Sequence, residues 1–175
     1  MVMEYFVQYH IYGKFGFPGS PSPDSKRLSE ATHVITSSKD YFLEESKGNI
    51  VFLILGIVVE KNKRKEYYLW SKTRIKDFEG DEAWGKQDYM DPIPCLNQVP
   101  GFWDFLKSLG HGGTGLMKVT DWPFTKNLIN LSEKNICTNP NQITRGDHID
   151  KFKKELNRKY KTPFRKIELL NNRFE

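Results

Sequence analysis

The longest apolar run in the chain covers residues 50–59 and predicts the central strand of a β-sheet. It consists of apolar residues, many of them β-branched, with a single glycine, Gly56. Because no polar residue alternates with the apolar ones, we expect both faces of this strand to be covered. A charged segment, residues 60–66, separates the run from residues 67–70, where the apolar pattern resumes. This arrangement predicts a β-hairpin, and Gly56 predicts a bulge or bend in its first arm.

Shorter patterns on both sides of the hairpin predict the remaining elements. Strands are expected at residues 5–12, 33–36 and 116–119, and residues 71–76 extend the second arm of the hairpin. Helices are expected at residues 38–45, 101–109 and 147–160, and from Thr125 or Asn127 to Leu131. Residues 77–100 contain three prolines and are interpreted as a long loop, and residues 164–170 as an edge strand or a docked end. The expected fold is α+β: a curved, mostly antiparallel sheet or partial β-barrel with flanking helices.

Length and charge predict one domain with a basic end. A chain of 175 residues is most often a single domain, here residues 1–175, with a core at about 5–135 and a basic helical segment at 147–175. The net charge is +5, and from Lys151 onward nine basic residues accompany three acidic ones. No signal-peptide pattern is present, and the widely spaced Cys95 and Cys137 indicate free buried thiols. We therefore expect a cytoplasmic protein.

The residues that most often carry catalysis are scattered along the chain. The four histidines (His10, His33, His111 and His148) are isolated from one another, and no Gly-x-Ser-x-Gly motif is present. Histidine and cysteine lack the paired spacing of a metal site. Metal-dependent nucleases need carboxylates converging near the attacking water, and the acid–lysine segments at residues 60–63 and 150–151 lack an upstream acid. No catalytic residue, metal ligand or cofactor is predicted, and a nuclease is kept as the enzymatic alternative.

Basic and aromatic residues together favour a nucleic-acid ligand, DNA or RNA. Lysine and arginine attract phosphates, and aromatic faces hold unstacked bases with about 1–3 kcal/mol each. The predicted phosphate-binding residues are Lys63 and Arg64 in the hairpin turn and Lys151, Lys154, Arg158, Lys159, Lys161 and Arg165 near the C-terminal end. A protein-interaction module or toxin–antitoxin component is the further alternative, and it would present its aromatic residues as a flat exposed patch.

Three segments resemble the PUA-like superfamily and, within it, the EVE-type domains related to the YTH readers. They are the first strand with its aromatic–glycine exit at residues 9–17, the "glycine, polar residue, strand, Gly-Ile" segment at residues 48–57, and the strand at residues 67–70. Asn49 stands where the family usually has an acidic residue. The resemblance implies a small curved barrel with flanking helices. It also implies a modified base flipped into an aromatic pocket, and some such domains are specificity modules of restriction systems.

The resemblance also implies which residues would hold the base. Some of Tyr12, Phe15, Phe17, Trp70 and Trp84 would enclose it. A flipped base needs two parallel faces and a polar group for its hydrogen-bonding edge, which Ser37, Ser38, Asn97 or Asp77 would supply. The function expected from the sequence is thus a nucleic-acid-binding module. It would serve as a specificity domain of a restriction or RNA-processing system with further domains or subunits.

Overall fold

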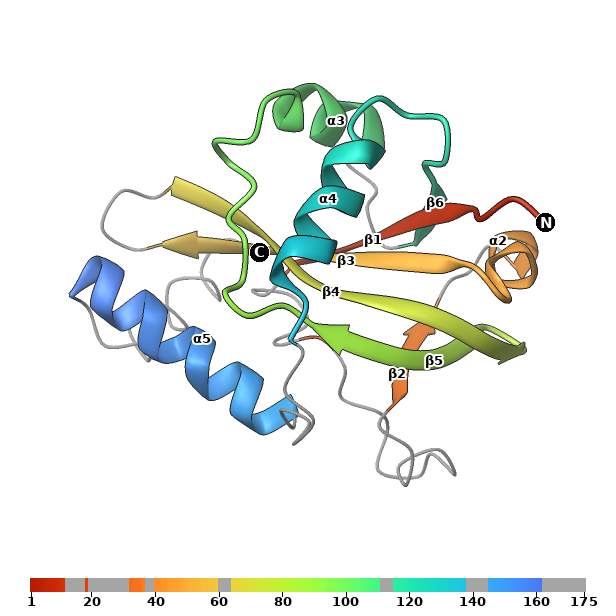
Figure 1. Cartoon of the computed structure of the whole chain (residues 1–175), viewed down its shortest axis with the longest axis horizontal. Coiled ribbons are helices and arrows are strands. Elements are labelled where there is room, and N and C mark those ends of the chain that lie inside the picture. Colours follow the sequence, from red (N-terminus) through yellow and green to blue (C-terminus); the bar gives the residue numbers. More distant parts are fainter. Residues whose placement is uncertain are drawn as a thin grey trace.

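Six strands drawn from most of the chain form one open mixed sheet in the computed structural model (Figure 1). The structure describes residues 1–11, 18, 32–36, 40–59, 64–110, 115–137 and 145–161. The strands are β1 (Tyr5–Ile11), β2 (Thr32–Thr36), β3 (Ile50–Val59), β4 (Arg64–Glu79), β5 (Glu82–Tyr89) and β6 (Leu116–Lys118). The helices are α2 (Asp40–Ser46), α3 (Phe102–Leu109), α4 (Thr125–Asn135) and α5 (Arg145–Tyr160).

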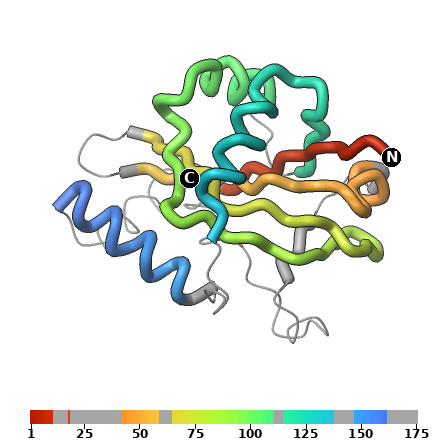
Figure 2. The backbone as a smooth tube through the Cα atoms, viewed as in Figure 1, coloured from red at the N-terminus to blue at the C-terminus, as the bar shows by residue number. Residues whose placement is uncertain are grey.

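The order of strands across the sheet is β2-β5-β4-β3-β1-β6. Four of the five pairings are antiparallel, and β1 with β3 is the parallel one. Figure 2 shows these two strands side by side although a long stretch of chain separates them. No pairing joins the edge strands β2 and β6 among the described residues, so the sheet does not close. The predicted α+β fold with a mostly antiparallel sheet is confirmed.

The β3–β4 hairpin lies at the centre of the sheet, as the sequence predicts. Every residue of β3 from Val51 to Ile57 is buried. The strand pairs with β1 on one side and with β4 on the other, which explains why its sequence shows no polar alternation. The second arm also extends beyond residue 76, because β4 continues to Glu79.

The interpretation of residues 77–100 as one long loop is wrong. The chain turns at Gly80 and Asp81 and returns as β5, which pairs with β4 on one side and β2 on the other. The buried positions of β5 are held by Ala83 and Gly85, while larger and mostly polar residues occupy the other positions. Small residues at the buried positions give little apolar signal, so the period-2 pattern of the strand is hidden in the sequence.

Gly56 serves a close contact and not a bulge. The register of β3 against β4 shifts between Leu53 and Ile54, three residues earlier. A Cβ atom at Gly56 would lie 2.5 Å from the hydroxyl oxygen of Tyr9 on β1. The missing side chain therefore makes room for the tyrosine ring, and the predicted bulge does not lie at this glycine.

The helix predictions are confirmed with shifted ends. Helix α4 continues four residues beyond the predicted end at Leu131, and α5 begins two residues before the predicted Asp147. The predicted cap of α2, Ser38, lies outside the described residues. No described helix combines the length and apolar character needed to cross a membrane.

Adjacent tyrosines of β4 separate the two faces of the sheet. The Tyr67 ring lies 5.3 Å from that of Phe102 in α3, and the Tyr68 ring lies 5.0 Å from that of Phe152 in α5. Because consecutive side chains of a strand point to opposite faces, α3 and α5 lie on opposite faces of β4. Phe124, at the start of α4, contacts Phe102, so α3 and α4 share one side, called here the α3–α4 face (Figure 1).

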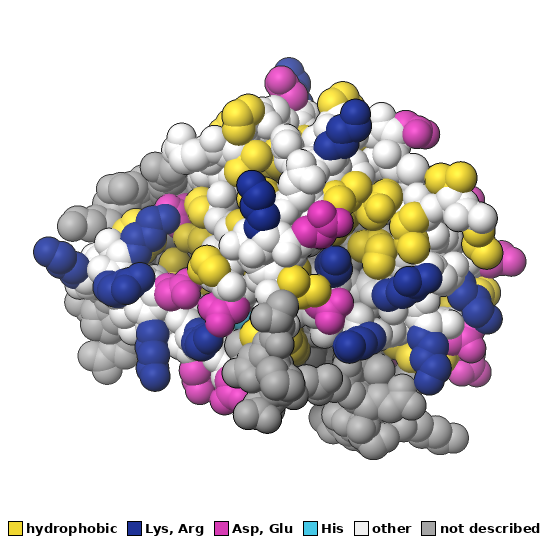
Figure 3. Space-filling view, viewed as in Figure 1, with side chains coloured by type: hydrophobic (Ala, Val, Ile, Leu, Met, Phe, Trp, Pro, Cys, Tyr) yellow, Lys and Arg dark blue, Asp and Glu magenta, His cyan; other side chains and the backbone are white. Residues whose placement is uncertain are grey.

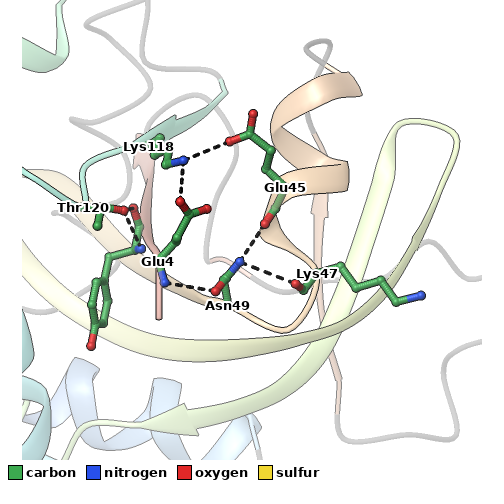
Figure 4. Close-up of polar contacts among 7 residues, drawn as sticks. Glu4, Glu45, Lys47, Asn49, Lys118 and Thr120 are labelled. Carbon is green, nitrogen blue, oxygen red and sulfur yellow. Dashed lines mark hydrogen bonds and ion pairs between the residues drawn. The ribbon is translucent and has the colours of Figure 1, made fainter. Parts of the chain in front are cut away.

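Asn49 joins three elements at the start of the central strand (Figure 4). Its Oδ1 accepts a hydrogen bond from the backbone N–H of Glu4 at 3.0 Å, and its Nδ2 donates to the carbonyl oxygen of Glu45 at 2.7 Å. Lys118 completes the cluster through ion pairs with Glu4 at 2.6 Å and Glu45 at 3.2 Å. A carboxylate at position 49 would accept the first bond but could not donate the second. The amide is therefore the side chain that this junction requires.

Candidate nucleic-acid interface

Several residues predicted to bind a base or a phosphate are outside the part of the chain that the structure describes. They are Tyr12, Phe15, Phe17, Ser37, Ser38, Lys63 and Arg165, and the side chain of Arg64 belongs with them. Their roles stay predictions.

Trp70 and Asn97 have structural positions that remove them from a ligand surface. The Trp70 side chain is 0% exposed and makes edge contacts with His148 and Phe152, with ring centroids 4.4 Å and 5.2 Å apart. Asn97 is buried, accepts a hydrogen bond from the N–H of Tyr67 at 2.8 Å and donates to the carbonyl of Lys65 at 2.9 Å. In this structure neither side chain has a face open to a base.

The predicted cations of α5, together with Lys161 directly after the helix, divide into those with and those without an ion pair among the described residues. Lys151 forms an ion pair with Asp91 at 2.6 Å, and Lys159 forms one with Glu66 at 3.3 Å. Lys154, Arg158 and Lys161 are exposed and make no ion pair with any residue that the structure describes. These three remain available for phosphate.

Glu66 anchors α5 to the sheet. Glu66 is 1% exposed, and its carboxylate accepts hydrogen bonds from the hydroxyls of Tyr68 and Tyr160, with Lys159 beside it. Burial acts to raise the pKa of Glu66, but the two tyrosine hydroxyls and the Lys159 charge outweigh it and hold the pKa below its ordinary value. Sequence reasoning missed this role because Glu66 follows a run of charged residues that resembles a solvated turn.

His148, on α5, is a second buried polar group at the contact between this helix and the sheet. Its ring lies 4.4 Å from that of Trp70 and 4.5 Å from that of Tyr89, and the imidazole donates a hydrogen bond to the backbone carbonyl of Trp70. Its Nε2 has no hydrogen-bond partner among the described residues. Burial lowers the pKa of His148 to about 4, so the imidazole is neutral in the folded protein at pH 7.

We expect the free energy of unfolding to fall as the pH drops below about 6.5, because unfolded histidine then takes up a proton that the buried imidazole refuses. With a folded pKa of about 4, His148 accounts for a loss of about 1 kcal/mol by pH 5.5. Urea unfolding at pH 7.5, 6.5 and 5.5 measures this loss. The His148→Asn variant, whose amide can replace the donated hydrogen bond, should show a flatter dependence. Equal slopes for both proteins would contradict the assignment.

The exposed end of the β4–β5 pair carries a group of residues that we call the β4–β5 platform: Arg74, Asp77, Trp84 and Lys86. Arg74 is the cross-strand partner of Lys86, and Asp77 is the partner of Trp84. Opposite residues of paired strands project to the same face, as do Trp84 and Lys86, two positions apart on β5. The four side chains therefore share one face.

The platform lies on the α3–α4 face, in a part that the described helices leave uncovered. Arg74 is the cross-strand partner of Ile50, and Tyr67 is the partner of Gly56. Because Ile50 and Gly56 lie an even number of residues apart on β3, Arg74 projects to the same face as Tyr67, whose ring contacts Phe102 of α3. Arg74 and Lys86 are nevertheless exposed. Figure 3 shows lysine and arginine side chains gathered over this part of the molecule, with acidic side chains among them.

The cations of the platform differ from others nearby in having no acidic partner. Neither Arg74 nor Lys86 makes a side-chain ion pair or hydrogen bond within the described residues, whereas Lys47 pairs with Asp77 at 3.0 Å. Further along the strands Lys72 opposes Asp88, so their charges offset each other. Two exposed cations, which are cross-strand partners of each other, thus lie together on one side of a partly buried indole, an arrangement that suits a polyanion with planar bases.

The structure brings together two residues that the sequence named separately. Trp84 and Asp77 were both candidates for contact with a base, and the β4–β5 pairing makes them direct neighbours. Arg74 and Lys86 were missed. The signal that would have found them is the alternation of charged with small or apolar residues in β4 and β5, which is recognisable only when residues 82–89 are taken as a strand.

Gly85 lets the two strands of the platform approach each other. A Cβ atom at this position would lie 1.8 Å from the carbonyl oxygen of Arg74 and 2.6 Å from its carbonyl carbon. The register of the pair shifts immediately beyond, between Ile75 and Asp77. Glycine is thus required where the pairing is irregular.

Comparison with known protein families, with curated protein sequences and with solved structures finds no match to this chain.

Within the described ranges, no three histidine, cysteine, aspartate or glutamate residues are placed to hold a metal ion. Cys95 and Cys137 are free thiols, as predicted, although both are only partly buried.

Proposed function

We propose that this protein is a nucleic-acid-binding module and that the β4–β5 platform contacts the nucleic acid. The observation that carries the proposal is the position of Trp84 beside two exposed cations, Arg74 and Lys86, which form no ion pair within the described residues, on a part of the sheet that no described helix covers. The indole offers a base a stacking surface, and the two cations offer its phosphates a counter-charge.

The spacing of the platform suits a single strand. Trp84 and Lys86 are two residues apart on β5, which corresponds to about 6.7 Å, and neighbouring strands lie about 4.8 Å apart. A base stacked on the indole would thus have its own or the adjacent phosphate within reach of Lys86 or Arg74. In a duplex the bases are paired and stacked internally, so the ligand that fits best has unpaired bases.

The resemblance to PUA-like domains belongs to the same proposal. Its support is that residues 50–57 of the segment at residues 48–57 belong to the buried central strand β3, which runs parallel to β1. In this proposal Tyr12, Phe15 and Phe17 would help to enclose a base, which would be a modified one. The protein would then act as the specificity domain of a restriction or RNA-processing system.

The test is fluorescence anisotropy of short labelled single-stranded DNA and RNA, with a duplex of the same sequence, at 50 and 200 mM salt with Mg²⁺ present. We expect single strands to bind more tightly than the duplex and affinity to fall with salt. No binding of any probe at 50 mM salt would overturn the proposal. A probe shortened during incubation would identify a nuclease instead.

Truncation of Trp84 to alanine should weaken binding about 5- to 150-fold, because base–aromatic stacking contributes about 1–3 kcal/mol. The salt dependence should stay nearly unchanged, since the phosphate contacts remain. Trp84→Phe is the matched control and should keep most of the affinity. Equal affinities for the alanine variant and the unmodified protein would place the base elsewhere.

A further inference from the structure

We infer that Asp77 makes the β4–β5 platform prefer bases that carry an exocyclic amino group over uracil and thymine. The inference rests on the proposed function and concerns the same site. It follows from the position of the Asp77 carboxylate, from the partners that hold it and from the one oxygen they leave available.

Asp77 is placed beside the surface on which a base would stack. It is the cross-strand partner of Trp84, and side chains opposite each other in an antiparallel pair have Cβ atoms about 4.5–5.5 Å apart. Its side chain is 48% exposed, so the carboxylate can be reached from solvent. A base lying on the indole would therefore present an edge toward this carboxylate.

Two contacts orient the carboxylate through one of its oxygens. Oδ1 accepts a hydrogen bond from the backbone N–H of Phe78 at 3.0 Å and lies 3.0 Å from Nζ of Lys47. Oδ2 makes no hydrogen bond with any residue in the described part of the chain. The side chain is thus fixed on one side and offers a hydrogen-bond acceptor on the other.

The charge of Asp77 is compatible with a nearby phosphate backbone. The hydrogen bond from Lys47, followed by that from the Phe78 N–H, holds the pKa of Asp77 below its usual value, so the carboxylate is ionised and only accepts hydrogen bonds at neutral pH. Lys47 balances the negative charge locally. Arg74 and Lys86 then leave the platform with an excess of positive charge.

An acceptor at this point discriminates between bases by chemistry. Cytosine and adenine present an amino donor, whereas thymine and uracil present the O4 carbonyl at the corresponding position. The amino group can donate to Oδ2, while a carbonyl oxygen there would be repelled by the carboxylate. Hydrogen bonds to charged groups are among the stronger ones in proteins, so the discrimination is measurable even at a partly exposed site.

The experiment compares single-stranded deoxycytidine and deoxyuridine oligonucleotides of equal length by fluorescence anisotropy. These two bases are both pyrimidines and differ mainly in the amino or carbonyl group at position 4, so stacking is closely matched. We expect the deoxycytidine oligonucleotide to bind about tenfold more tightly. Asp77→Asn should reduce this ratio to near one, because an amide can both donate and accept.

Asp88→Asn is the matched control. It also removes one negative charge, but at a position of β5 that opposes Lys72 and not Trp84. It should keep the tenfold ratio. Equal binding of both oligonucleotides by the unmodified protein would overturn the inference and leave the proposed function intact. If both variants lose the preference for the deoxycytidine oligonucleotide, that preference depends on net charge, and the inference is overturned too. Binding of neither oligonucleotide would overturn the proposed function itself.

Discussion

Replacing Arg74 and Lys86 together by glutamate is expected to weaken the binding of single-stranded oligonucleotides roughly 100-fold at low salt, because two phosphate contacts become repulsive. The slope of log affinity against log salt should become shallower by about 1.4, since each phosphate contact of a single strand contributes about 0.7. Both side chains are exposed and form no ion pair within the described residues, so thermal unfolding should stay close to that of the unmodified protein.

The matched comparison for this double variant is Lys154→Glu with Arg158→Glu on α5. It changes the net charge by the same amount and reverses two exposed cations that also have no ion-pair partner in the described part of the chain. If the loss of affinity is greater for the α5 variant, the phosphate contacts belong to that helix. If it is greater for the sheet variant, they belong to the platform.

Gly85→Ala is expected to destabilise the protein by about 3 kcal/mol or more. The added methyl group would lie 1.8 Å from the carbonyl oxygen of Arg74, and the obstacle is backbone that cannot turn aside as a side chain can. Relief requires β5 to move away from β4, and this movement breaks hydrogen bonds between the two strands. Urea unfolding followed by tryptophan fluorescence measures the change in the free energy of unfolding.

Gly80→Ala provides the control from the same hairpin. Gly80 has a positive φ of 59°, and a Cβ there would meet nothing within 4 Å, so the cost is backbone strain alone, about 1 kcal/mol. A Gly85→Ala protein no less stable than Gly80→Ala would show that β4 and β5 do not approach as closely as described.

The sequence was sufficient to predict the elements whose side chains carry a strong apolar pattern. Residues 50–59 and the helix around Phe152 were recognised because burial there selects large apolar side chains at regular spacing. Strand β5 was missed because its buried positions hold Ala83 and Gly85, which leave no such pattern. Its sequence therefore resembled a loop.

The site was harder to predict because composition does not show which groups neutralise one another. Lys151 and Lys159 contribute to the basic C-terminal end, yet both are committed to carboxylates, Asp91 and Glu66. Trp70, at a strand end in the sequence, is enclosed once α5 packs over β4. Such outcomes depend on residues that are distant along the chain, and a local pattern does not contain them.

The arrangement of β1 has a consequence for the order in which the fold is completed during synthesis. This first strand lies between β3 and β6, and its partners in β6 are residues 116–118. While the ribosome is still translating the middle of the chain, β1 has one neighbour at most, and one row of its backbone groups remains open. The sheet can be finished only after about two thirds of the chain has emerged, since the N-terminal strand waits for a partner made more than one hundred residues later.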